Sequence, residues 1–212
     1  MQVVGVDKVD IPRKTIYRLS IYSRCLKRLH ENGMKTVSSN SLAQVANVKS
    51  AQLRKDLGYF GQLGTRGLGY PVELLLDTIR DVLGGATLQP VVLVGVGNLG
   101  RALLHYDGFR KEGFEVLAAF DVKPDVIDQE GLPVPVLHDD LMIDFIAAKG
   151  VRMAILCVPA KYGQEVANVL VNAGVVGILN FSPTILQVPD QVVVTRVDLA
   201  MELESLSYFI DQ

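Results

Sequence analysis

One short run constrains the fold of this chain most: four apolar residues lead directly into a glycine-rich turn, Val91-Val92-Leu93-Val94-Gly95-Val96-Gly97-Asn98-Leu99-Gly100. A buried strand, a G-x-G-x-x-G turn and a following helix form the unit that holds the pyrophosphate of a dinucleotide. Gly95 permits the tight turn, Gly97 lets the backbone approach the pyrophosphate, and Gly100 allows close helix packing. Because the motif starts only at residue 91, a separate module precedes it.

A second apolar segment supports the dinucleotide interpretation. Residues 114–121 are typical of a buried strand and end in Asp121, where an acidic side chain accepts hydrogen bonds from the adenosine ribose. A carboxylate there repels a 2′-phosphate, which favours NAD(H) over NADP(H), although Lys123 opposes that discrimination. Besides the six motif residues Gly95, Val96, Gly97, Asn98, Leu99 and Gly100, the expected cofactor contacts are Asp121, Val122 and Lys123.

The rest of the chain continues to alternate between strands and helices. We expect strands at 151–158, 177–181 and 192–194, and helices near 139–148 and 162–173. This alternation predicts an α/β fold with a doubly wound parallel sheet. Val158 and Pro159 end one of these strands on the side of the sheet where ligands bind, so both are candidate cofactor contacts.

Charge is divided unevenly along the chain. Residues 1–70 hold 12 Lys and Arg against 4 Asp and Glu, the remainder holds 9 against 19, and the whole chain carries −2. A basic module beside an acidic one favours a polyanionic partner for the first and separate roles for the two. The alternative is a merely solvated basic face.

The basic module is predicted to contain three helices. Apolar residues at helical spacing indicate a helix over 12–31, Ser38 or Ser39 can cap a short second helix, and a third runs from about 50 to 60. The core side of the third helix holds Leu53, Leu57 and Phe60. The side pointing away from the core holds Gln52, Arg54 and Lys55. These side chains suit a recognition helix in the major groove, although many small bundles also have three short helices.

Residues 61–70 are rich in glycine and carry one cation, Arg66, near their middle. They predict a tight hairpin, or wing, with Arg66 at its tip, suited to the narrow minor groove of an A·T-rich flank. Three residues would anchor this hairpin: Leu63, Leu68 and Tyr70. A flexible linker is the alternative. A further helix is expected at 72–83, and Gly84-Gly85 marks a boundary between domains.

Several classes of protein are disfavoured. No apolar run approaches the roughly 18 uncharged residues of a membrane span, and residues 1–30 carry Arg and Lys throughout, so we expect a cytoplasmic protein. Metal-ligand spacing is absent from the two cysteines and three histidines, Cys25, Cys157, His30, His105 and His138, so we expect no metal site. His138 is expected in a linker, and no catalytic set follows the glycine motif.

The last residues predict a helix with one apolar side, made of Leu199, Leu203, Leu206 and Ile210. This stripe packs either on the chain's own sheet or across a dimer. DNA-reading modules usually act in symmetric pairs, which favours the dimer.

In order along the chain, eight segments resemble the Rex family of redox-sensing transcriptional repressors: IPRKTIYRLSIYSRCL, AQLRKDLGYFG, GTRGLGY, VGVGNLGRALLHYDGF, FDVKP, CVPA, GILNFSP and VDLAMELESLSY. The resemblance covers almost the whole chain. The third helix departs from the family at Lys49-Ser50, where a Thr-Pro type start is usual, which leaves its N-cap open, and at Gly58, where a Ser is common.

The resemblance implies a homodimer with an N-terminal winged-helix domain at 1–84, a Rossmann-like NAD(H)-binding domain at 85–197 and a C-terminal helix at 198–212 exchanged onto the partner. It implies a repressor that binds palindromic operators when NADH is scarce and releases them when NADH binds, with NAD+ as a weaker opposing ligand. It also implies a switch network near the nicotinamide, whose matching positions here are Arg24, Tyr106 and Asp198. Tyr106 is therefore a candidate cofactor contact as well.

The candidate contacts to operator DNA are Ser38, Ser39, Lys49, Ser50, Gln52, Arg54, Lys55, Tyr59 and Arg66. Two other functions remain as alternatives. One is an NAD-dependent oxidoreductase with an unusual N-terminal domain, for which Tyr106 is the available acid or base. The other is a winged-helix regulator that senses a different nucleotide. We expect a sensor and no enzyme, because a general acid or base with a substrate pocket is not evident.

Overall fold

The computed structural model describes residues 11–85 and 87–210, and the chain divides into two compact units, Met1–Thr87 and Leu88–Gln212. The division falls two residues after the Gly84-Gly85 pair. Gly84 has φ +79°, a left-handed conformation that ends the preceding helix and that glycine adopts without strain.

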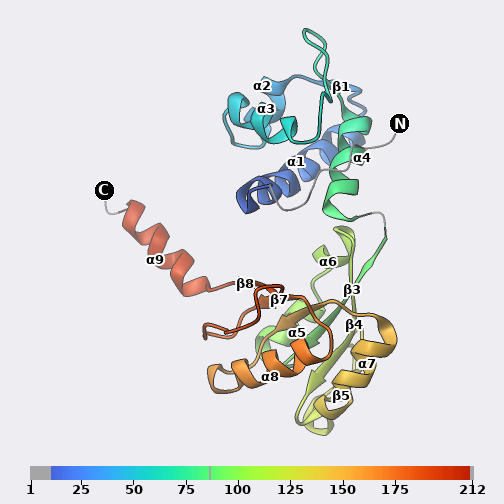
Figure 1. Ribbon diagram of the computed structural model, residues 1–212, viewed down its shortest axis with the longest axis vertical. Coiled ribbons are helices and arrows are strands. Elements are labelled where there is room, and N and C mark those ends of the chain that lie inside the picture. The colour runs from blue at the N-terminus through green and yellow to red at the C-terminus, as the bar shows by residue number, and fades with distance from the viewer. Residues whose placement is uncertain (1–10, 86, 211–212) are drawn as a thin grey trace. The chain divides into compact units, whose positions relative to one another are not determined.

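The first unit contains four helices and one small sheet among its described residues (Figure 1). The helices are α1 (Arg13–Glu31), α2 (Ser39–Val45), α3 (Ser50–Gly58) and α4 (Val72–Leu83). Strands β1 (Thr36–Val37) and β2 (Tyr70–Pro71) pair antiparallel. All four predicted helices are confirmed, and α3 is two residues shorter than expected. The two short strands were not predicted, because two residues give no measurable alternation.

The core of the first unit lies between its four helices. Its fully buried side chains come from all four helices: Leu19, Tyr22, Leu26, Leu42, Leu53, Leu57, Leu75 and Ile79. Phe60 lies beyond the end of α3 and is only partly buried against this core. The apolar side predicted for α3 is thus correct at Leu53 and Leu57, and the helix ends before its third member.

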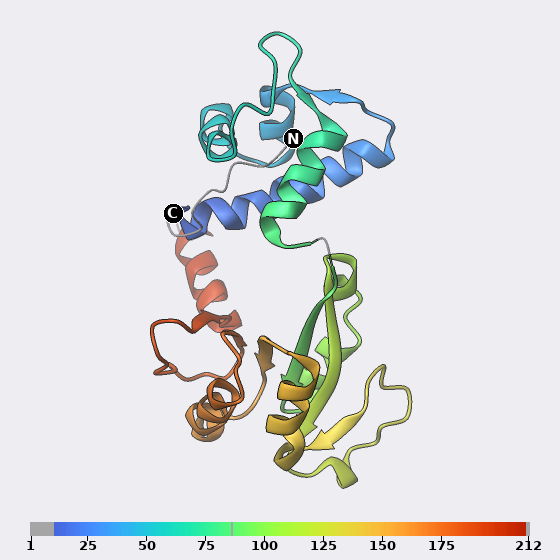
Figure 2. The same ribbon diagram turned by 45° about the vertical axis from the view of Figure 1, so that its right-hand side comes forward.

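The predicted wing is a hairpin (Figure 2). The amides of Thr65 and Gly69 each donate to the other residue's carbonyl at 3.0 Å, and Gly67 and Gly69 have positive φ. Leu63 and Tyr70 pack against the core of the unit as expected. Leu68 does not anchor the hairpin, because its side chain is 74% exposed. It follows Gly67 in the turn and is not among the residues that pack against the core.

The second unit is built on a six-stranded parallel sheet. Its strands are β3 (Gln89–Val94), β4 (Phe114–Asp121), β5 (Val136–His138), β6 (Met153–Leu156), β7 (Gly177–Asn180) and β8 (Val193–Arg196). Their order, β5-β4-β3-β6-β7-β8, is that of two mononucleotide-binding halves that meet between β3 and β6. The predicted doubly wound sheet is confirmed.

Helices cover both faces of this sheet (Figure 1). They are α5 (Asn98–Leu104), α6 (Gly108–Lys111), α7 (Met142–Lys149) and α8 (Ala160–Asn172), joined by the 3-10 turns η2 (Pro124–Val126) and η3 (Asp139–Leu141). Along β3, Val91 and Leu93 face the α5 side, and Val92 and Val94 face the side of α7 and α8. A strand buried on both faces explains the unbroken apolar run.

The last described element, α9 (Leu199–Ile210), is exposed along its whole length. The least exposed of its large apolar side chains is Met201, at 52%, and the most exposed is Ile210, at 73%. Packing of this helix on the chain's own sheet, one of the two expected arrangements, is therefore wrong. No helix among residues 11–85 and 87–210 is both long enough and apolar enough to cross a membrane.

Candidate functional site

The glycine loop occupies the point where the strand order reverses. Gly95 has φ +94°, and a Cβ there would lie 2.7 Å from the Cys157 carbonyl oxygen and 2.9 Å from Cγ1 of Val158. A side chain at Gly100 would collide with the Gly95 carbonyl. The loops after β3 and β6 therefore touch each other, and only glycine fits between them. At the same edge of the sheet, Pro159 is exposed and precedes α8.

Gly97 is different from the two packed glycines. It precedes α5 as its N-cap with φ −71°, it is exposed, and a Cβ added to it would meet nothing within 4 Å. Asn98 and Leu99, the first residues of α5, are exposed beside it. The space above Gly97 is therefore open to solvent, at a helix N-terminus whose free N–H groups favour an anion.

Asp121 fixes the loop and faces the same edge. Its Oδ2 accepts a hydrogen bond from the Val96 amide at 2.9 Å, and its Oδ1 accepts one from the Lys123 amide at 3.0 Å. Each carboxylate oxygen can accept a second hydrogen bond, so the two oxygens of Asp121 can still bind two ribose hydroxyls. Val122 and Lys123 are exposed next to it. The structure brings the glycine loop, Asp121 and Val158 together as the sequence predicted.

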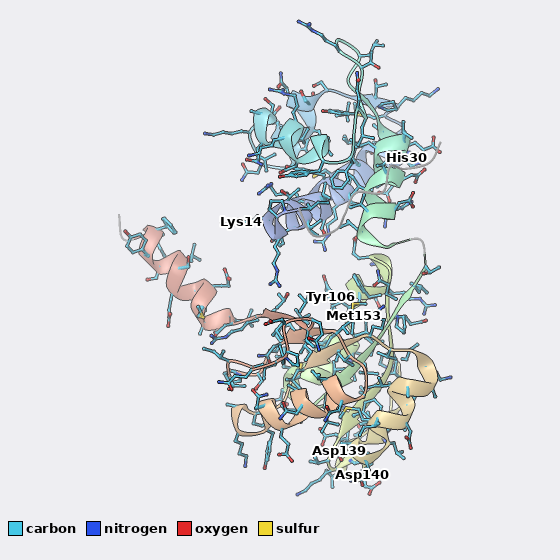
Figure 3. All side chains as sticks on the ribbon, in the orientation of Figure 1. Lys14, His30, Tyr106, Asp139, Asp140 and Met153 are labelled. Carbon is cyan, nitrogen blue, oxygen red and sulfur yellow. The ribbon has the colours of Figure 1, made fainter. Side chains whose placement is uncertain are left out.

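Tyr106 does not join this group. It follows the C-terminal end of α5. Figure 3 draws it toward the end of the sheet where Met153 begins β6, whereas Asp139 and Asp140, which follow β5, lie toward the opposite end. Its ring packs edge-on against Phe109 with centroids 5.1 Å apart, and Gly108 leaves room for it. Within one chain, Tyr106 is therefore at the amino edge of the sheet, whereas that chain's glycine loop follows β3 at the carboxyl edge.

Asp198 caps α9. Its Oδ1 accepts hydrogen bonds from the amides of Ala200 and Met201 at 3.1 and 3.2 Å, and its Oδ2 binds Nη2 of Arg196 at 2.6 Å. The hydrogen bond from the Met201 amide contributes most to lowering the pKa of Asp198, and Arg196 adds to it. Asp198 therefore presents an ionised carboxylate at the start of the exposed helix. Arg24, the third residue of the expected switch network, is exposed on α1.

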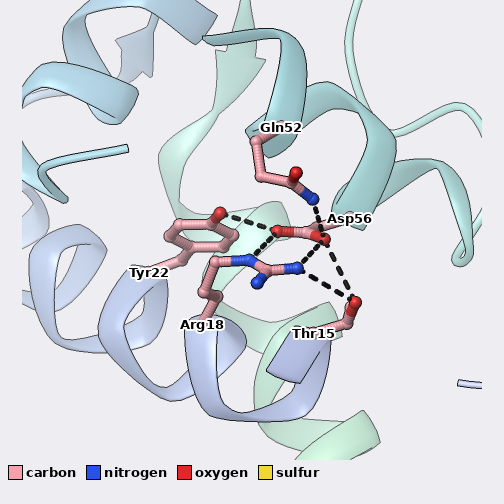
Figure 4. A network of polar contacts seen from close by, with 5 residues as sticks. All are labelled: Thr15, Arg18, Tyr22, Gln52 and Asp56. Carbon is pink, nitrogen blue, oxygen red and sulfur yellow. Dashed lines mark hydrogen bonds and ion pairs between the residues drawn. The ribbon is translucent and has the colours of Figure 1, made fainter. Parts of the chain in front are cut away.

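A buried carboxylate joins α3 to α1 (Figure 4). Asp56 of α3 is 1% exposed and accepts hydrogen bonds from Thr15 Oγ1 at 3.1 Å and Tyr22 OH at 2.8 Å. Arg18 binds it with Nε at 2.5 Å and Nη2 at 2.6 Å, and Gln52 adds Nε2 at 2.9 Å. This cluster was not predicted from the sequence. The prediction that Gln52 points away from the core is wrong, because Gln52 is half-buried and its side chain is hydrogen-bonded to Asp56.

The cluster stays charged despite its burial. Burial alone raises the pKa of Asp56, but the hydrogen bonds from Arg18, Tyr22 and Gln52 outweigh it and the pKa is lowered. The hydrogen bond to Asp56 raises the pKa of Arg18. Burial, followed by the hydrogen bond to Asp56, raises the pKa of Tyr22. An ionised carboxylate with a protonated phenol and a guanidinium is the stable arrangement.

The other candidate DNA contacts lie on α2, α3 and the hairpin. Ser38 caps α2 through a hydrogen bond from the Ser41 amide at 3.0 Å, and Arg54 Nη1 donates to Ser39 Oγ at 3.1 Å. Lys49 gives α3 no side-chain cap, so that helix starts with free N–H groups. Arg54, Lys55 and Arg66 are exposed, and Ser50 and Tyr59 are half-buried.

A cleft of about 510 Å³ separates the hairpin from α2 and α3, lined among others by Ser38, Arg54 and Tyr70. Exposed cations and hydroxyls therefore gather on one side of the first unit. This is the composition that nucleic-acid backbones bind.

His138 is not in a linker, as the sequence suggested, but is the last residue of β5. Its Nδ1 lies 3.0 Å from Asp139 Oδ1 and 3.2 Å from Asp140 Oδ2. His138, Asp139 and Asp140 are consecutive in the chain, so their side chains lie close together at this surface turn. The strand itself was missed because it is only three residues long and follows Pro133 and Pro135.

Two protein families match separate parts of the chain. Residues 10–58 match the family described as "Putative DNA-binding protein N-terminus", and residues 87–184 match the family described as "CoA binding domain". The first match lies in the first unit, and the second match lies, except for residue 87, in the second unit.

Solved structures share the whole architecture. The structure of RSP in complex with beta-NAD+ and operator DNA has a TM-score of 0.88 at 36% identity, covering 95% of this chain and 93% of that one. The structure of RSP in complex with beta-NADH has a TM-score of 0.83 at 35% identity, covering 96% of each chain. RSP is described as a Rex-family repressor.

Curated relatives are more similar to this chain in sequence than these solved structures are. The redox-sensing transcriptional repressor Rex of Carboxydothermus hydrogenoformans is 48% identical over 200 residues, which cover 94% of this chain and 96% of that protein. The protein of the same name from Pelotomaculum thermopropionicum is 45% identical over 96% of each. Identity at this level along both units, in a shared two-unit architecture, places this chain in the Rex family of redox-sensing transcriptional repressors.

Proposed function

We propose that this chain represses transcription by binding operator DNA and releases that DNA when NADH binds. The observation that carries the proposal is the arrangement around Gly97: an open helix N-terminus, with Asp121 beside it, in a chain whose other unit presents exposed cations on a helix. The sheet binds the dinucleotide and the helical unit binds the DNA. Neither role needs a catalytic group, so the chain acts as a repressor and not as an oxidoreductase.

The dinucleotide binds with its pyrophosphate above Gly97 and its adenosine ribose on Asp121. Free N–H groups of α5 attract the pyrophosphate, and the carboxylate accepts hydrogen bonds from both ribose hydroxyls. Gly95, Val96, Asn98, Leu99 and Gly100 form the rest of the loop. Val122, Lys123, Val158 and Pro159 border it at the ends of β4 and β6. The sensed ligands are NADH and NAD+.

DNA binds to α3 and the hairpin. Arg54 and Lys55 enter the major groove, Ser38, Ser39, Lys49, Ser50 and Tyr59 contact the backbone, and Arg66 reaches the minor groove of an A·T-rich flank. The operator is palindromic because the protein is a homodimer, and a two-fold axis requires two equivalent half-sites. Such a repressor works in the cytoplasm.

The homodimer forms through α9. Seven large apolar side chains of that helix are 52–73% exposed, and an apolar surface of this kind marks a protein interface. The helix is exchanged onto the second protomer, as in the domain arrangement 1–84, 85–197 and 198–212 expected from the sequence. Because Tyr106 lies away from its own glycine loop, the switch network of Arg24, Tyr106 and Asp198 is completed across this dimer.

Selection from a random DNA library tests the proposal. The purified protein is expected to enrich a palindrome, to bind it with a Kd that rises when NADH is added, and to elute as a dimer. NAD+ at the same concentration is expected to leave most of the complex intact. The ionic strength is kept constant, because the phosphate contacts depend on salt. Failure to enrich any DNA sequence would contradict repression, and consumption of NADH with a carbonyl substrate would favour the oxidoreductase.

A further inference from the structure

The Gln52 side chain on α3 is held in one orientation by Asp56. Its Nε2 donates to Asp56 Oδ1 at 2.9 Å, from a position one helical turn earlier. An ionised carboxylate only accepts hydrogen bonds, so the amide oxygen of Gln52 cannot take the place of the nitrogen. The chemistry of the partner therefore decides which side of the amide faces Asp56.

Asp56 is itself held in place from α1. Thr15, Arg18 and Tyr22 all donate to it, at 2.5–3.1 Å, and its side chain is 1% exposed. Rotation of this carboxylate toward solvent would break five hydrogen bonds at once and leave the Arg18 charge without its partner. The orientation of Gln52 is thus fixed by the interior of the unit and not by its surface.

The amide oxygen is the group that Gln52 leaves available. Figure 4 shows Oε1 pointing away from the Asp56 carboxylate. Among the described residues, none donates a hydrogen bond to it, and the side chain is half-buried at the edge of the face that carries Arg54 and Lys55. A glutamine without such a tether uses both amide groups on adenine, N6 and N7. Here the nitrogen is already engaged.

A hydrogen-bond acceptor with a fixed orientation distinguishes two kinds of base in the major groove. Adenine N6 and cytosine N4 are amino donors, whereas guanine O6 and thymine O4 are acceptors that oppose another oxygen. Resting on the proposed DNA-binding function, we infer that Gln52 acts toward DNA as a hydrogen-bond acceptor and selects a base with an exocyclic amino group at one position of each half-site. Adenine and cytosine share this chemistry.

Base analogues in the operator selected by the wild-type protein test the inference. Each adenine is replaced in turn by purine, which lacks the amino group, or by 7-deazaadenine, which lacks N7, and each cytosine by 2-pyrimidinone. At one position per half-site, loss of the amino group is expected to weaken wild-type binding about three- to tenfold, the range of one hydrogen bond. Loss of N7 there is expected to have no effect. The base at the sensitive position, adenine or cytosine, shows which of the two Gln52 contacts.

Two variants assign the effect to Gln52. Gln52→Ala and Gln52→Met, which keeps the side-chain volume, are expected to bind the natural and amino-deleted operators equally at that position. Gln44→Ala removes an exposed glutamine of α2 and is expected to keep the wild-type profile. Circular dichroism and urea denaturation of each variant confirm that the unit that carries Gln52 is folded.

Each outcome has one meaning. A wild-type loss caused by 7-deazaadenine at the Gln52-dependent position, or an amino-group effect unchanged in both Gln52 variants, overturns the inference and leaves the proposed function intact. A wild-type protein that selects no operator overturns both.

Discussion

Arg18 of α1 holds Asp56 of α3 through two nitrogens, with Nε 2.5 Å from Oδ2 and Nη2 2.6 Å from Oδ1. The helix that carries Arg24 is thereby joined to the helix that presents Arg54 and Lys55. A charged contact, and not apolar packing alone, therefore holds α1 and α3 together.

Removal of this carboxylate should destabilise the first unit. We expect Asp56→Ala to lower the free energy of unfolding by about 3 kcal/mol, because Arg18 and Tyr22 lose their partner in a buried site. Urea denaturation followed by circular dichroism measures this. The matched control is Asp77→Ala, which breaks an exposed 3.7 Å pair with Arg80 and should cost about 0.5 kcal/mol or less. Equal effects of the two variants would contradict the assigned role.

The same carboxylate should make stability depend on pH. Burial raises the pKa of Asp56, but its hydrogen bonds lower it further, so the folded value lies below the unfolded value of about 3.9. Its contribution is then present above the unfolded pKa and lost as the pH falls through the folded pKa. We expect the stability difference between the wild type and Asp56→Asn to be constant from pH 7 to 5 and to shrink below about pH 4. A difference independent of pH down to 2 would refute this.

Two glycines of one loop should respond differently to a methyl group. Gly97→Ala should change the free energy of unfolding by less than about 1 kcal/mol, because a Cβ there meets nothing within 4 Å. It should weaken NADH binding at least about tenfold, since the methyl group occupies the space of the pyrophosphate. Gly100→Ala should destabilise the fold by about 1–3 kcal/mol, because its Cβ collides with the Gly95 carbonyl. Fluorescence titration and urea denaturation give both values. Unchanged NADH affinity in Gly97→Ala would rule out this site for the pyrophosphate.

Asp121 should decide between the two nicotinamide cofactors. Asp121→Ser removes the charge that repels a 2′-phosphate and the acceptor for the ribose hydroxyls, so the ratio of NADPH to NADH affinity should rise about tenfold or more. Lys123, two residues away, would then assist the phosphate. Asp125→Ser changes an exposed acid of η2 and serves as the control. If both variants keep the wild-type ratio, Asp121 does not contact the ribose.

Local sequence predicted the strand, the glycine turn, the helix that follows and the position of Asp121 beside the turn. These residues lie close along the chain, and each residue type has one structural use there. Local sequence does not predict hydrogen bonds between residues that are far apart along the chain. Thr15, Arg18 and Tyr22 are 34–41 residues from Asp56, and no pattern within α1 or α3 reveals which of their faces meet. The prediction that Gln52 points away from the core is wrong for this reason.

Tyr106 and Leu68 show two other limits of sequence reasoning. Gly97 and Tyr106 are close along the chain, but α5 lies between them and carries Tyr106 to the other edge of the sheet. Leu68 is apolar, yet a residue in a hairpin turn has nothing to pack on. Apolar character alone does not bury a side chain when the backbone turns away from the core.

We propose that NADH and operator DNA oppose each other's binding on one molecule, and reciprocal titration tests this most directly. The Kd for operator is measured with and without saturating NADH, and the Kd for NADH with and without saturating operator, in one buffer. Linkage requires the same factor in both directions, and a tenfold factor corresponds to about 1.4 kcal/mol. We predict that each ligand raises the other's Kd by one common factor of at least about ten. Operator affinity that stays the same at saturating NADH would contradict the account.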